Sequence, residues 1–313
     1  MKVTPKPRVD VLQALPELAH EVATTIRLHP RRGHVADLAG SKIGGAFLWP
    51  EDEPWPTLPS MKGGQLSGIG VDYPWAWKWT APDNTPIELT PVLQLNKRDV
   101  PDFPFPEGKD LFQLLWQALA TKDTPYSCLP HVIWRSTDSV KSHRHNMPVS
   151  LHIDPNYVPR SCYLTFERVA EYPHIAHLSD EQIERLEKWI SQLDVSVEGY
   201  TSEFEEFASI LYQYELSTCP DTKLGGYPDW IQDPEVPTCD CSREMDHLLT
   251  IQDIGIDSGS YQRWLPVEDH DLWNRGLFDL VSNAPDLSLG GGAMYYFVCR
   301  SCENWPIKVV YQR

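Results

Sequence analysis

The sequence predicts an α+β fold that is mostly β, in which a β-rich unit is internally duplicated and only a few helices are present. Three observations predict it: a motif that occurs twice in a similar context, many short apolar segments separated by turn residues, and few segments with helical spacing. The 28 prolines of the 313-residue chain support this prediction, because proline ends helices and favours the turns that join short elements.

The repeated motif is a lysine, an aliphatic residue and two glycines, followed four residues later by tryptophan. It occurs as Lys42-Ile43-Gly44-Gly45 with Trp49, and again as Lys223-Leu224-Gly225-Gly226 with Trp230. Each copy precedes an apolar segment containing glutamine, and then an aromatic-rich segment; these are Leu93-Gln94-Leu95 and Leu249 to Gln252, then Phe112 to Trp116 and Tyr295 to Val298. Chance similarity of short apolar strings is the alternative, but three matching features in one order favour duplication.

The duplication sets the expected domain organisation. We expect residues 1–313 to form a single compact unit with two related halves, the first over about 30–120 and the second over about 215–313. The region between them, about 120–215, connects the halves and contains helices. In each motif, the paired glycines are expected to form the same tight turn with positive φ, which a side chain would hinder.

The individual elements follow from local periodicity. Leu12 to Ile26 show helical spacing around Pro16, which predicts a helix over 16–28 that Pro30 ends. Ser179 and Gln182 form a capping box before a second helix, and Phe204 to Tyr214 suggest a third. The expected strands are Val92–Leu95, Leu111–Trp116, His131–Trp134, Val149–Ile153, Tyr163–Val169, Leu248–Ile251, Tyr295–Cys299 and Ile307–Tyr311.

The net charge bears on partners and compartment. A charge of −17 repels nucleic acid and anionic membrane surfaces and favours a basic protein partner, although solubility alone would also explain it. No run of 18 apolar residues is present, so we expect no membrane span. The first residues lack the apolar stretch of a secretory signal, so we expect a cytoplasmic location. The oligomeric state stays open.

Four of the seven cysteines form two close pairs. Cys239 and Cys241 make a CxC pair, and Cys299 and Cys302 make a CxxC pair, each beside an expected strand. Thiolate pairs in a reducing compartment are typical of zinc, which takes four soft ligands in a tetrahedron. The alternatives are a reduced or redox-active CxxC with a fortuitous CxC, or a site in which His247 or Cys219 replaces one thiolate. Four protein ligands would leave no open position, so the expected cofactor is a structural zinc.

A second candidate site is aromatic. Trp75, Trp77 and Trp79 alternate along the chain, so on a strand all three side chains would face one side. They could form a binding platform for a peptide or ligand, or they could pack into the core.

The sequence offers little to support an enzyme. The carboxylates show no spacing that singles out an acid–base pair, and there is no G-x-S-x-G context, P-loop or dinucleotide fingerprint. We therefore expect a binding protein more than an enzyme, with an enzyme of unrecognised site as an alternative.

The second motif and its surroundings resemble a known family. Lys223 to Gln232, the Pro-x-Cys-x-Cys segment that ends at Cys241, Leu248 to Ile251, and Tyr295 to Cys302 are similar to the YwqG-like family of bacterial proteins of unknown function. That family is related to the eukaryotic programmed-cell-death-2 and ribosome-maturation proteins. Ser41 to Gly45 with Trp49-Pro50, and Leu93 to Asn96, match the first half. The sequence departs from the family pattern by having CxC where CxxC is usual.

The resemblance implies a function and a set of ligands. It implies a duplicated β-rich fold and, from the eukaryotic relatives, a chaperone that holds a newly made ribosomal protein. It also places cysteine pairs at Cys239, Cys241, Cys299 and Cys302. We therefore expect a zinc-stabilised protein-binding or chaperone-like protein for a basic or partly folded polypeptide. The alternative within binding functions is an immunity protein that neutralises a toxin.

Overall fold

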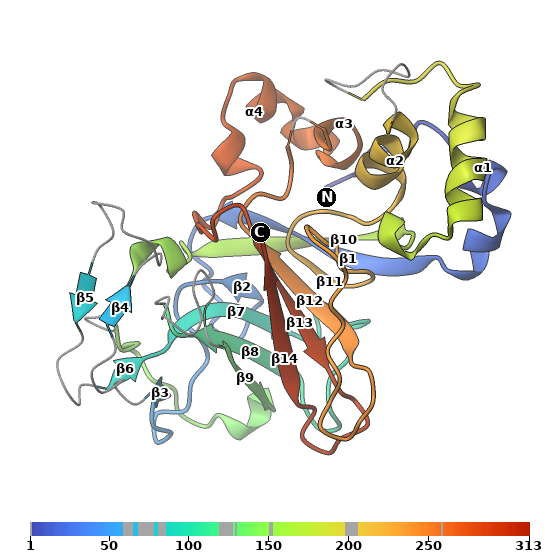
Figure 1. Ribbon diagram of the computed structural model, residues 1–313. Coiled ribbons are helices and arrows are strands. Elements are labelled where there is room, and N and C mark those ends of the chain that lie inside the picture. The colour runs from blue at the N-terminus through green and yellow to red at the C-terminus, as the bar shows by residue number, and fades with distance from the viewer. Residues whose placement is uncertain are drawn as a thin grey trace. The chain divides into compact units, whose positions relative to one another are not determined.

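The chain folds into two compact units. The computed structural model describes residues 2–58, 65–67, 78–80, 86–118, 128, 130–149, 153–197, 206–257 and 259–313 (Figure 1). Unit 1 comprises residues 1–29, 165–282 and 292–313, and unit 2 comprises residues 30–164 and 283–291. The fold is α+β and mostly β, as the sequence predicted.

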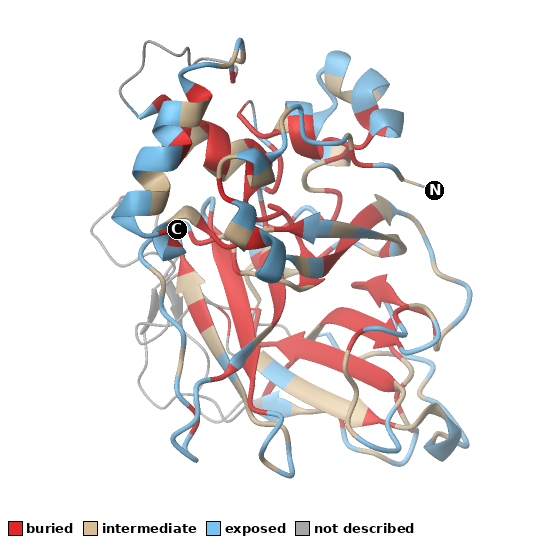
Figure 2. Cartoon of the chain, turned by 90° about the vertical axis from the view of Figure 1, so that its right-hand side faces the viewer, coloured by how far each residue is buried: buried red, intermediate tan, exposed pale blue. Residues whose placement is uncertain are grey.

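The strands of each unit form an antiparallel series. In unit 1 the order is β14-β13-β12-β11-β1, and in unit 2 it is β9-β8-β7-β2-β10. The bounds are β1 Ala23–Arg32, β2 Lys42–Ile43, β7 Thr90–Asn96, β8 Leu111–Trp116, β9 Pro130–Arg135, β10 Cys162–Glu171, β11 Lys223–Gly225, β12 Asp246–Gln252, β13 Ala293–Val298 and β14 Ile307–Gln312. Two small pairs are β3 Thr57–Leu58 with β6 Ile87–Glu88, and β4 Gln65–Ser67 with β5 Lys78–Thr80. The segments β8 and β13 are buried along their whole length, which accounts for their uninterrupted apolar and aromatic sequences. Figure 2 shows that buried residues are concentrated in the strands.

The two units repeat one register. Lys42 pairs with Gln94 in unit 2, and Lys223 pairs with Thr250 in unit 1. The following glycines share the left-handed conformation, with φ of 61° and 69° at Gly44 and Gly45 and 65° and 67° at Gly225 and Gly226. The duplication predicted from the motif is therefore present as matching strand pairing and matching turns.

The repeat extends beyond the turn. In each unit the register shifts once, between Pro91 and Leu93 in β7 and between His247 and Leu249 in β12. Pro91 faces Leu115 across its hairpin, just as His247 faces Phe297. The tryptophans of the motif then pack on these equivalent residues: Trp49 shares a buried cluster with Leu115, and Trp230 stacks on Phe297.

The glutamines of the two apolar segments, Gln94 and Gln252, do not occupy equivalent positions. The shared register places Gln94 opposite Lys42 but Thr250, not Gln252, opposite Lys223. Residues two apart on a strand face the same side, so matching residue types alone cannot detect a shift of two positions.

The first strands of the two halves are exchanged. Strand β1, which precedes the first motif, pairs with β11 of the second motif inside unit 1. Strand β10, which precedes the second motif, pairs with β2 of the first motif inside unit 2. Each unit therefore combines the strand that precedes one motif with four strands that begin at the other motif.

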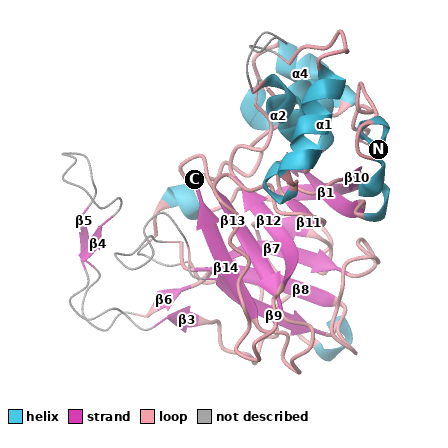
Figure 3. Cartoon of the chain, turned by 45° about the vertical axis from the view of Figure 1, so that its right-hand side comes forward, coloured by secondary structure: helices cyan, strands magenta, loops and turns pink. Residues whose placement is uncertain are grey.

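All four α-helices of the described residues belong to unit 1 (Figure 3). They are α1 Asp180–Ile190, α2 Phe207–Leu211, α3 Tyr261–Trp264 and α4 His270–Asn274. The predicted capping box is present, because Ser179 Oγ accepts from Gln182 N and the Gln182 side chain accepts from Ser179 N. Of the predicted third helix, Phe204 lies outside the described residues, and Phe207 to Tyr214 are helical, as α2 followed by a π-helical turn, η6 (Tyr212–Leu216). None of the helices in the described part of the chain has the length and apolar character needed to cross a membrane.

Two other expected elements were wrong or lie partly outside the described residues. Only Pro16–His20 of the predicted helix over 16–28 is helical, as a 3₁₀ turn, and Ala23–Arg32 is strand β1. The β-branched residues Thr24, Thr25 and Ile26 favour the strand, and Pro30 does not end a helix. Val149 and Ile153 are not in a strand, and residues 150–152 of that prediction lie outside the described residues.

A lysine is buried at the start of both motifs, and each unit satisfies it differently. Lys223 Nζ pairs with Glu171 Oε2 at 2.9 Å, and both side chains are fully buried. Glu171 also accepts from the backbone N–H groups of Cys219 and Tyr227. Lys42 Nζ instead donates to the carbonyls of Asp37, Leu38 and Ala46, and burial lowers the pKa of Lys42 to about 8.

We predict that Gly226→Ala is far more destabilising than Gly276→Ala. Both glycines have positive φ, so an alanine costs about 1 kcal/mol of backbone strain at either position. At Gly226 the new Cβ would also lie 1.9 Å from Glu171 Oε1, whereas nothing lies within 4 Å at Gly276. Disturbing the buried ion pair should bring the loss to about 3 kcal/mol or more, measured by urea unfolding. Equal losses for the two variants would contradict this prediction.

The carboxylate of Glu167 contacts the N-terminal segment of unit 1 at several atoms. Glu167 accepts from Thr4 N at 2.6 Å and from Thr4 Oγ1 at 2.7 Å, and its Oε2 lies 3.0 Å from His29 Nε2. Burial alone would raise the pKa of Glu167, but the contacts with His29 and Thr4 outweigh it and hold the pKa at about 2.

We therefore predict that Glu167→Gln loses about 2 kcal/mol of stability at neutral pH. The pKa of Glu167 in the folded state lies below the ordinary value of 4.5, so the carboxylate stabilises the fold fully above pH 4.5. That stabilisation is lost as the pH falls toward 2, and the two proteins should then converge in unfolding free energy. The exposed Glu235→Gln serves as the control. If the difference in unfolding free energy between the wild type and Glu167→Gln stays constant from pH 7 to pH 3, ionisation of Glu167 is not its cause.

Candidate metal centre

The first pair of cysteines lies in a tight turn between Trp230 and β12. Cys239 N donates to Arg243 O at 2.7 Å and Ser242 N donates to Cys239 O at 2.8 Å, with Ser242 in the left-handed region. Thr238 and Glu244 form a β-bridge on either side. This turn brings the side chains of Cys239 and Cys241 to the same place although they are only two residues apart.

The second pair lies in the turn that joins β13 to β14. Cys299 N donates to Pro306 O, and Trp305 N donates to Cys302 O, both at 3.1 Å. Cys239 and Cys299 are buried in a cluster with Trp230, Tyr295 and Phe297, which fixes the two turns against each other. Cys302 is partly exposed and Cys241 is exposed, so the site is open to solvent on one side.

The four sulfur atoms form one compact group. Their Sγ atoms all lie within 4.8 Å of one another, with 3.6 Å between Cys241 and Cys299 and 3.8 Å between Cys302 and each of Cys239 and Cys299. A tetrahedral ion with metal–sulfur bonds of about 2.3 Å has sulfur atoms about 3.8 Å apart. A disulfide would need about 2.05 Å, and these cysteines are free thiols. The spacing is therefore that of a metal site and not of a disulfide.

Electrostatics also favour a cation at this point. The backbone N–H of Arg243 stabilises the Cys241 thiolate and, with the neighbouring thiols, lowers the pKa of Cys241 to about 7. The hydrogen bonds that Cys302 makes with the other three thiols raise the pKa of Cys302 to about 12. Four thiols this close cannot all ionise unless a positive charge lies between them. A bound metal ion would supply that charge, and sulfur ligands select soft or borderline metals.

The structure brings together all four predicted cysteines and neither of the alternative ligands. His247 Nδ1 lies 3.2 Å from Gly226 O and its Nε2 lies 2.9 Å from Thr250 Oγ1, and burial lowers the pKa of His247 to about 3. Cys219 is fully buried and its thiol donates to Pro220 O. Within the described ranges, no other group of three or more His, Cys, Asp or Glu residues could hold a metal ion.

The aromatic candidate site lies largely outside the described residues. Trp75 and Trp77 fall outside them, and Trp79 lies in β5 with no description of its side chain. The proposed binding platform is therefore still a prediction.

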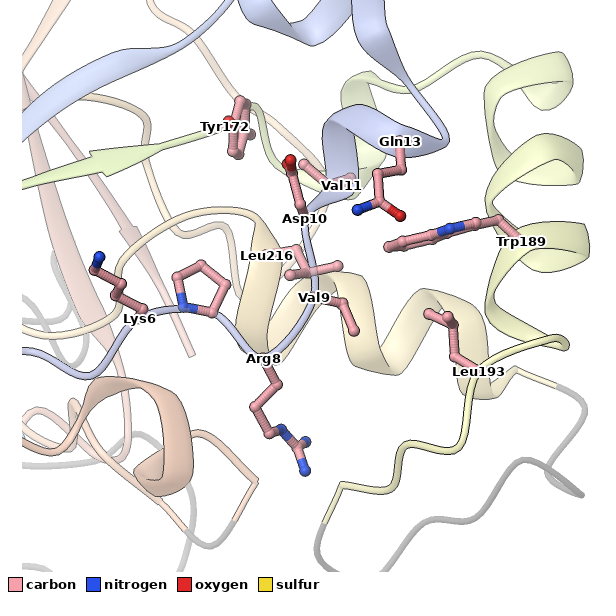
Figure 4. A pocket seen from close by; sticks show the side chains of 11 residues that line it. Lys6, Arg8, Val9, Asp10, Val11, Gln13, Tyr172, Trp189, Leu193 and Leu216 are labelled. Carbon is pink, nitrogen blue, oxygen red and sulfur yellow. The ribbon is translucent and has the colours of Figure 1, made fainter.

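Two hollows in the surface were not foreseen from the sequence. One, of about 520 Å³ in unit 1, lies between the N-terminal segment and α1, with Trp189 and Leu193 on one side and Val9 on the other (Figure 4). The second, of about 350 Å³, lies in unit 2 beside Ala46 and Met147. The only sequence signal for the hollow in unit 2 is Ala46, a small residue at the position where the other copy of the motif has Tyr227.

Comparison with models of protein families gives no match, and comparison with curated protein sequences gives none either.

We predict that each chain purified without added metal carries one metal ion. Cys241→Ser or Cys302→Ser should reduce the stoichiometry well below one, and Cys219→Ala should leave it unchanged, because Cys219 lies outside the cluster. Elemental analysis of the three proteins measures this directly. Full metal content in the Cys302→Ser protein, or a loss caused by Cys219→Ala, would show that the ligand set is different.

Proposed function

We propose that the protein is a zinc-stabilised binding protein for a basic or partly folded polypeptide. Zinc is the metal that best suits four cysteine ligands in a tetrahedron. All four positions would be filled by protein sulfur, so no position would remain for water or substrate, and the metal would support structure and not catalysis. The observation that carries the metal part is the set of sulfur–sulfur distances of 3.6 to 3.8 Å.

The charge distribution supports a basic partner. Unit 1 contains 29 Asp and Glu residues against 14 Lys and Arg, a net charge of −15, whereas unit 2 contains 15 against 13, a net charge of −2. Almost all of the excess negative charge of the chain therefore belongs to the unit that also contains the cysteine cluster. An acidic surface of this kind attracts basic polypeptides and raises their rate of association.

The groove of unit 1 supplies an apolar surface within this acidic unit. Trp189 and Leu193 line the groove on the side of α1, and the exposed residues of the same helix include Glu184 and Glu187. The groove of about 520 Å³ offers Trp189 and Leu193 to one apolar side chain, and its lining also holds Lys6, Arg8 and Asp10. The attraction for a basic polypeptide would therefore come from the net charge of unit 1 as a whole. The resemblance to the YwqG-like family and its chaperone relatives agrees with this proposal.

The zinc would act by tying two turns together. Residues 239–241 and 299–302 are joined to separate strand hairpins of one unit, so a metal link restricts the unfolded chain much as a disulfide does. The buried cluster around Trp230 and Phe297 also contains Met245, Tyr295 and Val310, whose apolar packing would remain if the metal were lost. We therefore predict that Cys299→Ser lowers the stability by about 2–3 kcal/mol yet leaves a folded protein, as judged by circular dichroism and thermal melting. Complete unfolding on chelation would show that the metal holds the fold itself.

The binding proposal is tested with charge reversal on α1. Glu184→Lys with Glu187→Lys should weaken binding of a basic partner captured from cell lysate on the order of tenfold, or about 1.4 kcal/mol. Glu107→Lys, an exposed reversal in unit 2, serves as the matched control and should have little effect. Binding should also fall as salt rises from 50 to 300 mM, because salt screens exposed charges. Captured proteins that are acidic, or binding that neither salt nor the double variant changes, would contradict the proposal.

A further inference from the structure

The internal repeat makes residues of one unit equivalent in position to residues of the other. Gly225 pairs with Thr25 in unit 1, and the shared register makes Gly44 and Ser161 the equivalent residues in unit 2. The glycine contacts agree: a side chain on Gly226 would meet Thr25, and one on Gly45 would meet Ser161. By the same register, Ala46 is equivalent to Tyr227, and residues 157–159 before β10 are equivalent to residues 21–23 before β1.

In unit 1 this position is filled by the tyrosine. The hydroxyl of Tyr227 donates to Glu21 O at 2.7 Å, so the phenol ring extends from the double-glycine turn to the residues that precede β1. Its ring is half-buried, and burial raises the pKa of Tyr227. A phenol side chain is therefore part of the packing of unit 1 at this point of the repeat.

In unit 2 the same position is a pocket. Ala46 ends at Cβ, and the space beside it is a hollow of about 350 Å³, within the size range of small-ligand sites. Its walls include Gly45 and Ala46, the equivalents of Gly226 and Tyr227, and Val158 and Pro159, the equivalents of the two residues that follow Glu21. The pocket of unit 2 thus lies where unit 1 holds an aromatic ring.

The other walls of the pocket suit such a ring. Pro91, Met147 and Pro148 offer flat or polarisable apolar surfaces, and the methionine thioether contacts aromatic rings favourably. Thr90, His145 and Asn146 add polar groups that can hydrogen-bond to a substituent on the ring. The pocket contains no Asp, Glu, Lys or Arg among its lining residues, so its ligand need not be charged.

We propose that this pocket binds one aromatic ring that carries a hydroxyl group, a ligand of the phenol class, in the position that Tyr227 occupies in unit 1. Two sources share this chemistry: a free phenol, and a tyrosine side chain presented by a polypeptide. The proposal concerns unit 2 and is independent of the cysteine cluster and of the groove in unit 1.

The first test uses p-cresol, which is the tyrosine side chain as a free molecule. Titration of the whole protein should move the imidazole NMR signals of His145 in a saturable way, with His145→Gln used to assign them. The matched probe 4-methylcyclohexanol, which has the same substituents on a saturated ring, should bind at least tenfold more weakly. Equal binding of the two probes, or no saturable change at His145 with p-cresol, would overturn the proposal.

The second test fills the pocket from within. Ala46→Tyr recreates the arrangement of unit 1 and should abolish p-cresol binding, whereas Ala176→Tyr at an exposed site in unit 1 should leave it intact. In the opposite direction, Tyr227→Ala opens the equivalent space in unit 1 and should lower the melting temperature. Added p-cresol should then raise the melting temperature of Tyr227→Ala more than that of the wild type. If a folded Ala46→Tyr protein binds p-cresol as the wild type does, or if p-cresol gives no extra rise in Tyr227→Ala, the equivalence of the two positions is wrong.

A peptide arm separates the two sources. A short peptide with one tyrosine between neutral residues should compete with p-cresol if a polypeptide can present the ring, and the same peptide with phenylalanine should bind more weakly because it lacks the hydroxyl. If p-cresol binds and the tyrosine peptide does not compete, the ligand is a free phenol. Both outcomes support the pocket, and failure of p-cresol to bind rejects it.

Discussion

The fully buried ion pair between Lys223 and Glu171 holds together the parts of unit 1 on which the rest of that unit depends. Neither side chain is exposed, so neither charge is solvated by water, and each relies on the other. Burial raises the pKa of Glu171, and the Lys223 ammonium acts in the opposite direction. The Glu171 carboxylate also accepts hydrogen bonds from Cys219 N and Tyr227 N. One carboxylate therefore joins the end of β10 to the start and the end of the segment 219–227.

The position of the cysteine cluster follows from this anchored segment. Trp230 comes four residues after Gly226 and is buried against Tyr295 and Phe297 of β13. The chain that leaves Trp230 is held to β14, where Gln312 accepts from Ile231 N and Gln232 N and Lys308 donates to Thr238 O. The turn of Cys239 and Cys241 is thereby placed beside the turn of Cys299 and Cys302 before any metal is considered. A metal ion would reinforce a contact that the packing has already formed.

Much of the fold and of the candidate metal centre could be predicted because both depend on local patterns. The double glycines adopt positive φ in both motifs, and the apolar stretches of β8 and β13 lie in fully buried strands. The two close cysteine pairs next to turns predicted the four residues that cluster in the structure. The predicted helix over 16–28 failed because its leucines fit helical spacing, whereas the β-branched residues that follow are held in β1 by pairing with β11. That pairing joins residues far apart in the chain, and no local pattern contains it.

The two pockets were unpredictable for a related reason. A hollow depends on which side chains are absent from a region, and segments that surround it come from separate parts of the chain. Ala46 is unremarkable in the sequence until the register shows that its counterpart is Tyr227. The concentration of negative charge in unit 1 is likewise invisible before the chain is divided, because that unit combines three separate stretches of sequence.

The exchange of first strands has a consequence for the order in which the chain can fold during synthesis. Strands β2, β7, β8 and β9 emerge from the ribosome well before β10, which completes their unit, so most of unit 2 can pair early. Strand β1 emerges first of all, yet its neighbours β10 and β11 follow roughly 140 and roughly 200 residues later, and such separations make both pairings slow as well as late. The segment of Thr24 to Leu28 therefore has no neighbouring strand until β10 has emerged, and it gains β11 only later. A nascent chain that stalls before β10 would expose that β-branched segment to other chains in the cell.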